Sequence, residues 1–167
     1  MKIMKFPIRY VPNTLTNKEK QKQLKMLLKS KKLYKQHKYY TRKKISYKNK
    51  KSSHLTDAYK IYNIKSISPN EELANKTGCQ LSALKQIVKK GEGAYFSSGS
   101  RPNQTAQSWG LARLASSITG GKSAAVDYNI LEKGCNHNKK AFLLAKQARK
   151  KYKYGQSKTK KNSFRII

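Results

Sequence analysis

Apolar residues recur along most of this sequence at intervals of three or four positions, which is the spacing of helices that bury one face. Leu24, Leu27 and Leu28 form one such stripe and predict a helix over residues 17–35. The same spacing predicts further helices around residues 55–62, between Pro69 and Gly78, and over residues 79–90, 105–118 and 138–152. A short strand is expected at residues 94–96 and a last short element at 124–131. The pattern predicts a mainly α protein: a small helical module with a helical hairpin, at most one short strand pair, and extended basic arms at both ends.

Two sequence motifs mark where helices begin. Thr16 and Glu19 have the spacing of a capping box, in which a hydroxyl accepts from a backbone N–H and an acidic side chain three residues later reaches back. Ser68 and Glu71 repeat that spacing around a proline. We therefore expect one helix to start near residue 17 and another near residue 69.

The two helices around residue 78 have the spacing of a helix-turn-helix. Ala74 permits close helix contact, Gly78 allows the tight turn, and Leu84 and Ile87 are apolar positions of the second helix, which Gly91 is expected to end. If this helix entered a DNA major groove, its exposed residues would be Gln80, Ser82, Lys85, Gln86 and Lys89. An ordinary helical hairpin that only packs against the rest of the protein is the alternative.

Charge changes this picture more than any motif does. Thirty-nine Lys and Arg face seven Asp and Glu in 167 residues, a formal net charge of +32. Residues 1–65 have a net charge of +18, residues 66–134 of +3 and residues 135–167 of +11. We therefore predict a compact, nearly neutral module at 66–134, a basic arm with one or two helices at 1–65, and a basic helix and tail at 135–167.

Such arms need counter-charge from a partner, and nucleic acid is the most common source because phosphate contacts release condensed counterions. In the first arm, tyrosines at 39, 40 and 47 are interleaved with cations, a mixture suited to lying along a polyanion. A solvated, partly disordered segment is the alternative. The last dozen residues are expected to become ordered only on a partner, with Phe164, Ile166 and Ile167 as an apolar anchor.

Several classes of protein are disfavoured. No apolar run is long enough to span a membrane, and no signal peptide is evident, so we expect an intracellular protein with reduced cysteines at Cys79 and Cys135. Gly121-Lys122-Ser123 resembles the end of a phosphate-binding loop but lacks the glycine required five residues earlier. Asp127 and Glu132 are better explained as structural carboxylates. We expect no enzyme activity, no cofactor and no metal site.

Many spaced positions between residues 68 and 135 are similar to a known family pattern. They are Ala74, Thr77-Gly78, Leu84, Val88, Gly91, Gly93-Ala94, Arg101-Pro102, Trp109, Ala112-Arg113, Ser116, Gly120-Gly121 and Asp127. In these positions the chain resembles an uncharacterised domain family encoded by large DNA viruses of algae and protists and by tailed phages. The resemblance implies a viral origin and no particular activity.

Three functions remain in view. The first is a virion structural protein, such as a minor capsid or cement component. It would bind the major capsid protein, other virion proteins or packaged nucleic acid. Its location would be the virion, and the host cytoplasm during assembly. The second is a viral DNA-binding or genome-condensing protein. The third is an RNA binder of ribosomal type.

The residues expected to contact a partner are mostly cations of the arms and of the predicted hairpin, with Trp109 as either an interface anchor or a core residue. They are Arg42, Lys43, Lys44, Lys48, Lys50, Lys51, Lys85, Lys89, Arg101, Trp109, Arg113, Arg149, Lys150 and Lys151.

Overall fold

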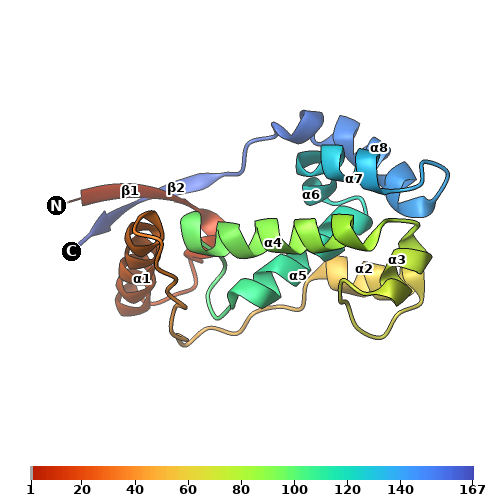
Figure 1. Ribbon diagram of the computed structural model, residues 1–167. Coiled ribbons are helices and arrows are strands. Elements are labelled where there is room, and N and C mark those ends of the chain that lie inside the picture. Colours follow the sequence, from red (N-terminus) through yellow and green to blue (C-terminus); the bar gives the residue numbers. More distant parts are fainter. Residues whose placement is uncertain (1) are drawn as a thin grey trace. The chain divides into compact units, whose positions relative to one another are not determined.

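The structure is a computed structural model that describes residues 2–167 (Figure 1). Its helices are α1 (Asn17–Lys35), α2 (Ser53–Tyr62), α3 (Glu71–Thr77), α4 (Leu81–Ser97), α5 (Ala106–Ile118), α6 (Lys122–Val126), α7 (Tyr128–Gly134) and α8 (Lys140–Lys151), with short 3₁₀ turns at Ile8–Tyr10 and Lys153–Gly155. Strands β1 (Lys2–Pro7) and β2 (Lys161–Ile166) form one antiparallel pair. The predicted fold class, mainly α with at most one short strand pair, is confirmed. None of the helices in this described range combines the length and apolar character needed to cross a bilayer.

The chain divides into two compact units that are discontinuous in sequence. Unit 1 contains residues 1–50, 92–109 and 158–167, and unit 2 contains residues 51–91 and 110–157. Helices α4 and α5 each contribute residues to both units. The units therefore cut across the three ranges over which charge is distributed.

In unit 1 the two ends of the chain pair with each other. β1 and β2 run antiparallel, from the pair Lys2 and Ile166 to the pair Pro7 and Lys161 (Figure 1). Along β2, half-buried residues alternate with exposed ones, as expected for a strand with one covered face. The expectation that this tail becomes ordered only on a partner is wrong. Its residues 161–166 form a strand that pairs with β1 of the same chain.

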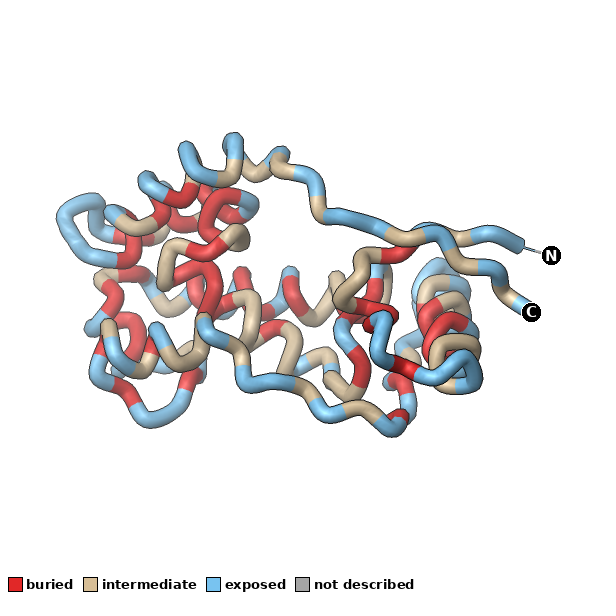
Figure 2. The backbone as a smooth tube through the Cα atoms, turned by 180° about the vertical axis from the view of Figure 1, so that it is seen from behind, coloured by how far each residue is buried: buried red, intermediate tan, exposed pale blue. Residues whose placement is uncertain are grey.

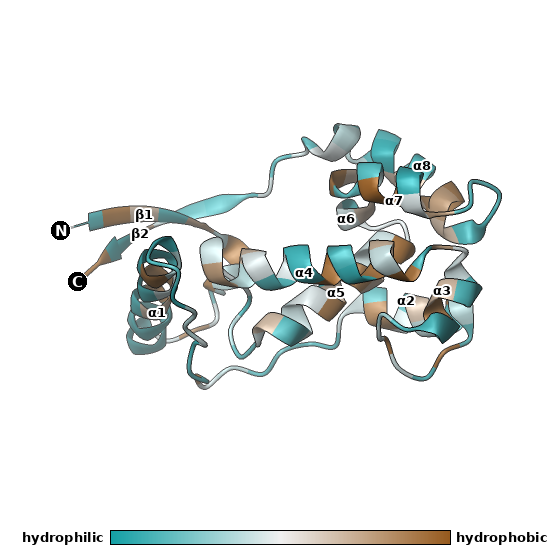
Figure 3. Cartoon of the chain, in the orientation of Figure 1, coloured by the Kyte–Doolittle hydropathy of each residue, from teal (hydrophilic) through white to brown (hydrophobic). Residues whose placement is uncertain are grey.

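The core of unit 1 is formed by side chains of β1, of the turn that follows it and of α1. Phe6, Val11, Leu24 and Leu27 are almost completely buried. Figure 2 draws the buried stretches of the chain in red. Most of the remaining circumference of α1 is hydrophilic, since the helix carries eight lysines (Figure 3). Unit 1 is thus a small apolar core covered by cations.

Helix α1 begins where its capping motif predicts. The Thr16 hydroxyl accepts a hydrogen bond from the Glu19 N–H at 3.2 Å. The Glu19 carboxylate accepts from the Ser46 N–H at 3.3 Å. The box is therefore half formed, and its acidic residue instead binds the basic segment that follows α1.

Unit 2 is a helical bundle around one apolar core. The fully buried side chains include Leu84 and Ile87 of α4, Leu114 and Ile118 of α5, and Leu131 of α7. These helices carry the hydrophobic residues drawn brown in Figure 3. The predicted last short element is in fact two short helices, α6 and α7, divided at Asp127.

Helices α3 and α4 form the predicted hairpin. Gly78 ends α3 with a φ of 75°, a left-handed conformation that side chains with a Cβ rarely adopt. The start of α3 differs from the expectation: Asn70, not Ser68, caps the helix, and its Oδ1 accepts from the Leu73 N–H at 2.9 Å. Asn70 lies directly before the helix, so its side-chain oxygen reaches a free backbone N–H of the first turn. Ser68 lies two residues earlier and does not cap the helix.

Helix α4 continues past Gly91, so the expected helix end there and the expected strand at residues 94–96 are both wrong. A Cβ at Gly91 would lie 2.6 Å from the Gly110 Cα, so the glycine allows α4 and α5 to cross in close contact. The buried stripe of α4 extends to Tyr95, which is completely buried. This tyrosine continues the helical period of Leu84 and Val88.

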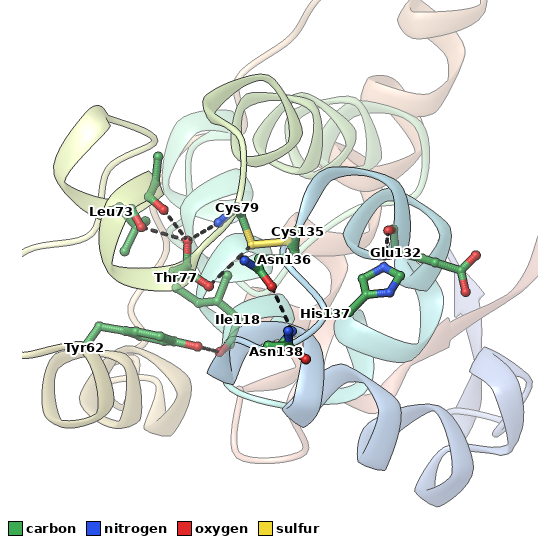
Figure 4. Close-up of a disulfide and its surroundings, with 11 residues drawn as sticks. Tyr62, Leu73, Thr77, Cys79, Ile118, Glu132, Cys135, Asn136, His137 and Asn138 are labelled. Atoms are coloured by element: carbon green, nitrogen blue, oxygen red, sulfur yellow. Dashed lines mark hydrogen bonds between the residues drawn. A yellow bond between two sulfur atoms is a disulfide. The ribbon is translucent and has the colours of Figure 1, made fainter.

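The two cysteines form a disulfide, which corrects the expectation that they are reduced (Figure 4). Cys79 follows α3 and Cys135 follows α7, and the two residues pair as an antiparallel β-bridge. Backbone hydrogen bonds of 2.7 Å flank the bridge, from Gln80 N–H to the Gly134 carbonyl and from Asn136 N–H to the Gly78 carbonyl. Residues 56 positions apart are thereby held together, a proximity that spacing in sequence does not reveal.

A buried ion pair joins α5 to the α6–α7 junction. Asp127 is 1% exposed, and its carboxylate accepts two hydrogen bonds of 2.7 Å from the guanidinium of Arg113. The ammonium of Lys90 lies 3.9 Å from the same carboxylate. Removing Asp127 would leave a half-buried cation without its counter-ion.

We predict that replacing both cysteines by serine lowers the free energy of unfolding by about 3 kcal/mol, because the disulfide closes a long loop and restricts the unfolded chain. Urea denaturation followed by circular dichroism measures the change. Wild-type protein in reducing agent should shift by the same amount, whereas titration of two free thiols in untreated, denatured protein would contradict the disulfide.

We also predict that Asp127→Asn destabilises the protein by about 3 kcal/mol, since breaking one side of a buried pair leaves the other charge uncompensated. Glu132→Gln, at an exposed position of α7, is the control and should change stability by less than about 0.5 kcal/mol. Equal effects of the two substitutions in urea denaturation would show that the Arg113 pair contributes no more than a surface charge.

Candidate functional site

Arg42, the first of the expected contact residues, lies inside unit 1. Its guanidinium donates to the Ser30 hydroxyl at 3.0 Å, the Tyr95 carbonyl at 2.9 Å and the Ser100 hydroxyl at 2.7 Å. It also lies 3.8 Å from the centre of the Tyr95 ring. Burial lowers the pKa of Arg42 from its usual value. This cation therefore organises the unit and is turned away from solvent.

The basic segment after Arg42 is held in place by one asparagine side chain. Asn103 accepts from the Ile45 N–H at 2.8 Å and donates to the carbonyls of Ile45 and Tyr47 at 3.1 and 2.6 Å. The Asn49 amide donates to the Pro102 carbonyl at 2.7 Å. The segment is thus fixed along the loop that follows α4, and Lys43, Lys44, Lys48 and Lys50 remain exposed.

A basic groove opens on unit 1 at the end of this segment. It has a volume of about 620 Å³, and cations from four separate stretches of chain line it. These cations are Arg9, Lys48, Lys50, Arg101 and Lys160. Neutral side chains complete the lining, and they are Ile8, Pro12, Asn13, Thr14, Tyr47 and Thr159. No carboxylate or histidine is among the described residues that line this basic groove.

Such a groove suits a chain of phosphates better than a single small anion. Its cations come from four stretches of chain rather than from one loop, and hydroxyl and amide side chains also line it. Phosphate and sugar oxygens accept hydrogen bonds from these types of side chain, while an aromatic ring such as Tyr47 offers a surface for stacking.

Three of the groove cations, Lys48, Lys50 and Arg101, are among the expected contact residues. Arg9 and Lys160 were missed. Arg9 follows β1 and Lys160 precedes β2, and the pairing of these two strands brings both cations to the basic groove. Alternation of apolar and polar residues at both chain ends would indicate two strands, and pairing of those strands would place Arg9 near Lys160.

The wider field of unit 1 is strongly positive. Its sequence holds 22 Lys and Arg against two acidic residues, a net charge of +20, compared with 17 against five and +12 for unit 2. Burial, followed by repulsion from Lys161 and Lys35, lowers the pKa of Lys31 on α1. Crowded cations of this kind produce a positive potential around unit 1, and its range depends on the salt concentration.

Most of the expected cations of unit 2 are accessible but scattered. Lys85 and Lys89 are exposed on α4, and Lys150 and Lys151 are exposed at the end of α8. Two others lie over tyrosine rings: the Lys51 ammonium is 5.1 Å from the centre of Tyr59, and the Arg149 guanidinium is 4.3 Å from Tyr128 and 5.0 Å from Tyr154. None of these residues is among the described residues that line the groove between α4 and α7.

A second, smaller groove of about 340 Å³ lies between α4 and α7 in unit 2. Gln80, Ser82 and Gln86, which the helix-turn-helix interpretation exposes to DNA, line it opposite Asn129 and Lys133. The polar face of the second hairpin helix therefore lines a groove together with α7 and does not stand clear of the rest of unit 2.

The remaining two expected residues have structural contacts. Trp109 is half-buried against the unit 1 core, edge-on to Tyr10 at a ring-centre distance of 6.2 Å. Arg113 is held by Asp127. Neither lines the basic groove.

Comparison with known proteins gives a match to one family model. No curated protein and no solved structure matches the chain. Residues 7–140 match a family of unknown function (DUF5824), and this range includes four of the five groove cations as well as the resemblance noted over residues 68–135. Because the match covers most of the sequence, the chain belongs to this family of unknown function (DUF5824).

Proposed function

We propose that this protein is a non-enzymatic nucleic-acid-binding protein whose unit 1 holds the sugar–phosphate backbone in the basic groove. The observation that carries the proposal is the convergence of Arg9, Lys48, Lys50, Arg101 and Lys160 on one groove from four stretches of chain. An anionic polymer relieves the mutual repulsion of these cations, whereas a neutral ligand leaves it in place.

The chemistry of the groove supports binding rather than catalysis. Lysine and arginine are its charged groups, and general acid–base or nucleophilic catalysis draws most often on histidine, carboxylates or an activated hydroxyl or thiol. Binding by this groove is expected to depend steeply on salt, because each phosphate that a cation neutralises releases condensed counterions.

We predict that the double substitution Arg101→Glu with Lys160→Glu weakens binding to a 20-nucleotide strand at least about 30-fold at 0.15 M salt. It should also reduce the slope of log K against log [salt] by about 1.5 to 2, since two phosphate contacts are lost. Fluorescence anisotropy at several salt concentrations measures both quantities.

The control for this experiment changes net charge equally in unit 2. Lys140→Glu with Lys146→Glu alters two exposed lysines of α8 and should weaken binding less than about threefold. If both double variants weaken binding to the same extent, overall charge rather than the groove explains the affinity.

A second candidate function is a virion structural component, of minor capsid or cement type, that binds acidic capsid surfaces. Two observations favour it: the resemblance to viral sequences over residues 68–135, and the Cys79–Cys135 disulfide. Disulfides persist in oxidising surroundings such as virion surfaces and are rare in the cytosol. Such a protein would be made in the host cytoplasm and then retained in the particle.

Mass spectrometry of purified, nuclease-treated particles tests this second function. A structural component remains at a fixed copy number per particle after the nucleic acid is digested. Loss of the protein together with the nucleic acid would contradict a capsid role and favour genome binding alone.

A further inference from the structure

Unit 1 carries a cluster of aromatic rings at its surface, apart from its core. We call Tyr34, Tyr39 and Phe96 the aromatic platform. The rings of Tyr34 and Phe96 are nearly parallel, at 8°, with centres 6.5 Å apart. Tyr39 is tilted against both, with centres 5.1 Å from Phe96 and 6.2 Å from Tyr34.

Both tyrosines of the platform are accessible to solvent. Tyr39 is 73% exposed and Tyr34 is 36% exposed, whereas Tyr10 and Tyr95 of the same unit are buried. Water in contact with these ring faces is displaced at little cost when a flat apolar group covers them.

Hydrogen bonds position the chain segments that carry the platform rings. The Ser30 hydroxyl donates to the Phe96 carbonyl at 3.1 Å, which joins α1 to the end of α4 within unit 1. After α1, the N–H groups of His37 and Lys38 donate to the carbonyls of Tyr34 and Leu33 at 3.0 and 2.9 Å. This turn returns the chain toward the helix, so that the Tyr39 ring lies against its two partners. Rings held in this way lose little conformational entropy when a ligand binds.

Lysines near the platform favour an anionic ligand. Lys35 and Lys38, both exposed, lie between Tyr34 and Tyr39 in sequence. Of the two carboxylates in unit 1, Glu19 accepts a hydrogen bond from Ser46, and Glu92 lies one turn of α4 before Phe96. A ligand with flat apolar faces and a repeating negative charge matches both features.

We propose that the aromatic platform stacks unpaired nucleobases, so that the protein prefers single-stranded to double-stranded nucleic acid. The inference rests on the proposed function, with the basic groove holding the backbone. In a duplex the base faces are covered by neighbouring bases and cannot reach exposed rings, whereas a single strand offers every base face for stacking. Because all bases have such a face, the preference is for strandedness and not for sequence.

The test compares three fluorescein-labelled ligands of equal length at one salt concentration: a 20-nucleotide thymidine strand, a 20-base-pair duplex, and a 20-nucleotide abasic strand. Fluorescence anisotropy gives each affinity for wild type, Tyr39→Ala and Tyr39→Trp. Tyr154→Ala is the matched control, since that tyrosine is 62% exposed in unit 2.

Wild-type protein should bind the thymidine strand about tenfold more tightly than the abasic strand, as stacking of a single base provides. Tyr39→Ala should lose about tenfold in affinity for the thymidine strand and less than twofold for the duplex and the abasic strand. Tyr39→Trp should retain the preference, and Tyr154→Ala should behave as wild type.

Two results would overturn the inference. If wild type binds all three ligands equally and Arg101→Glu with Lys160→Glu weakens all three, the basic groove binds nucleic acid but the platform does not stack bases. If wild type binds none of the ligands at physiological salt, the proposed function and this inference both fail. Circular dichroism melts establish that each variant is folded.

Discussion

The structure is constrained by an excess of positive charge, because the sequence has thirty-nine Lys and Arg but only seven Asp and Glu. Most cationic side chains therefore interact with groups other than carboxylates. Among the described residues three salt bridges form, two of them to Asp127. Tyrosine and phenylalanine rings take over part of this role: Lys29 lies over Tyr40, Lys31 over Phe6 and Arg149 over Tyr128. Arg42 is the extreme case, a buried cation satisfied by a carbonyl, two hydroxyls and a ring. Eleven tyrosines among 167 residues are consistent with this use.

The same constraint links the fold of unit 1 to its proposed function. Its elements come from both ends and the middle of the chain, and their contacts cover a small apolar core while cations accumulate outside. The basic groove and the aromatic platform are both products of this assembly, because each combines residues distant in sequence. A bound polyanion lowers the repulsion among these cations and stabilises the folded state to which it binds.

Unit 2 depends on a different balance. It has five of the seven acidic residues, a larger apolar core, a glycine-mediated crossing of α4 and α5, and the disulfide between the turns after α3 and α7. These features hold the helical bundle together from within the unit. The family match from residue 7 to residue 140 includes most of both units and every groove-lining residue except Thr159 and Lys160.

Elements that depend on neighbouring residues could be predicted from the amino-acid sequence. α1 starts at its Thr16 cap, α3 ends at Gly78, and α5 and α8 lie within about two residues of their expected bounds, because helical periodicity and capping act over one or two turns. Gly91 was misinterpreted, since a glycine that ends a helix and one that allows a close crossing look alike until the second helix is placed. Only the tertiary structure could decide the pairing of β1 with β2, the disulfide, the burial of Arg42 and the gathering of five groove cations. Each joins residues dozens to more than a hundred positions apart, and such contacts arise from packing of the whole chain, which no local pattern encodes.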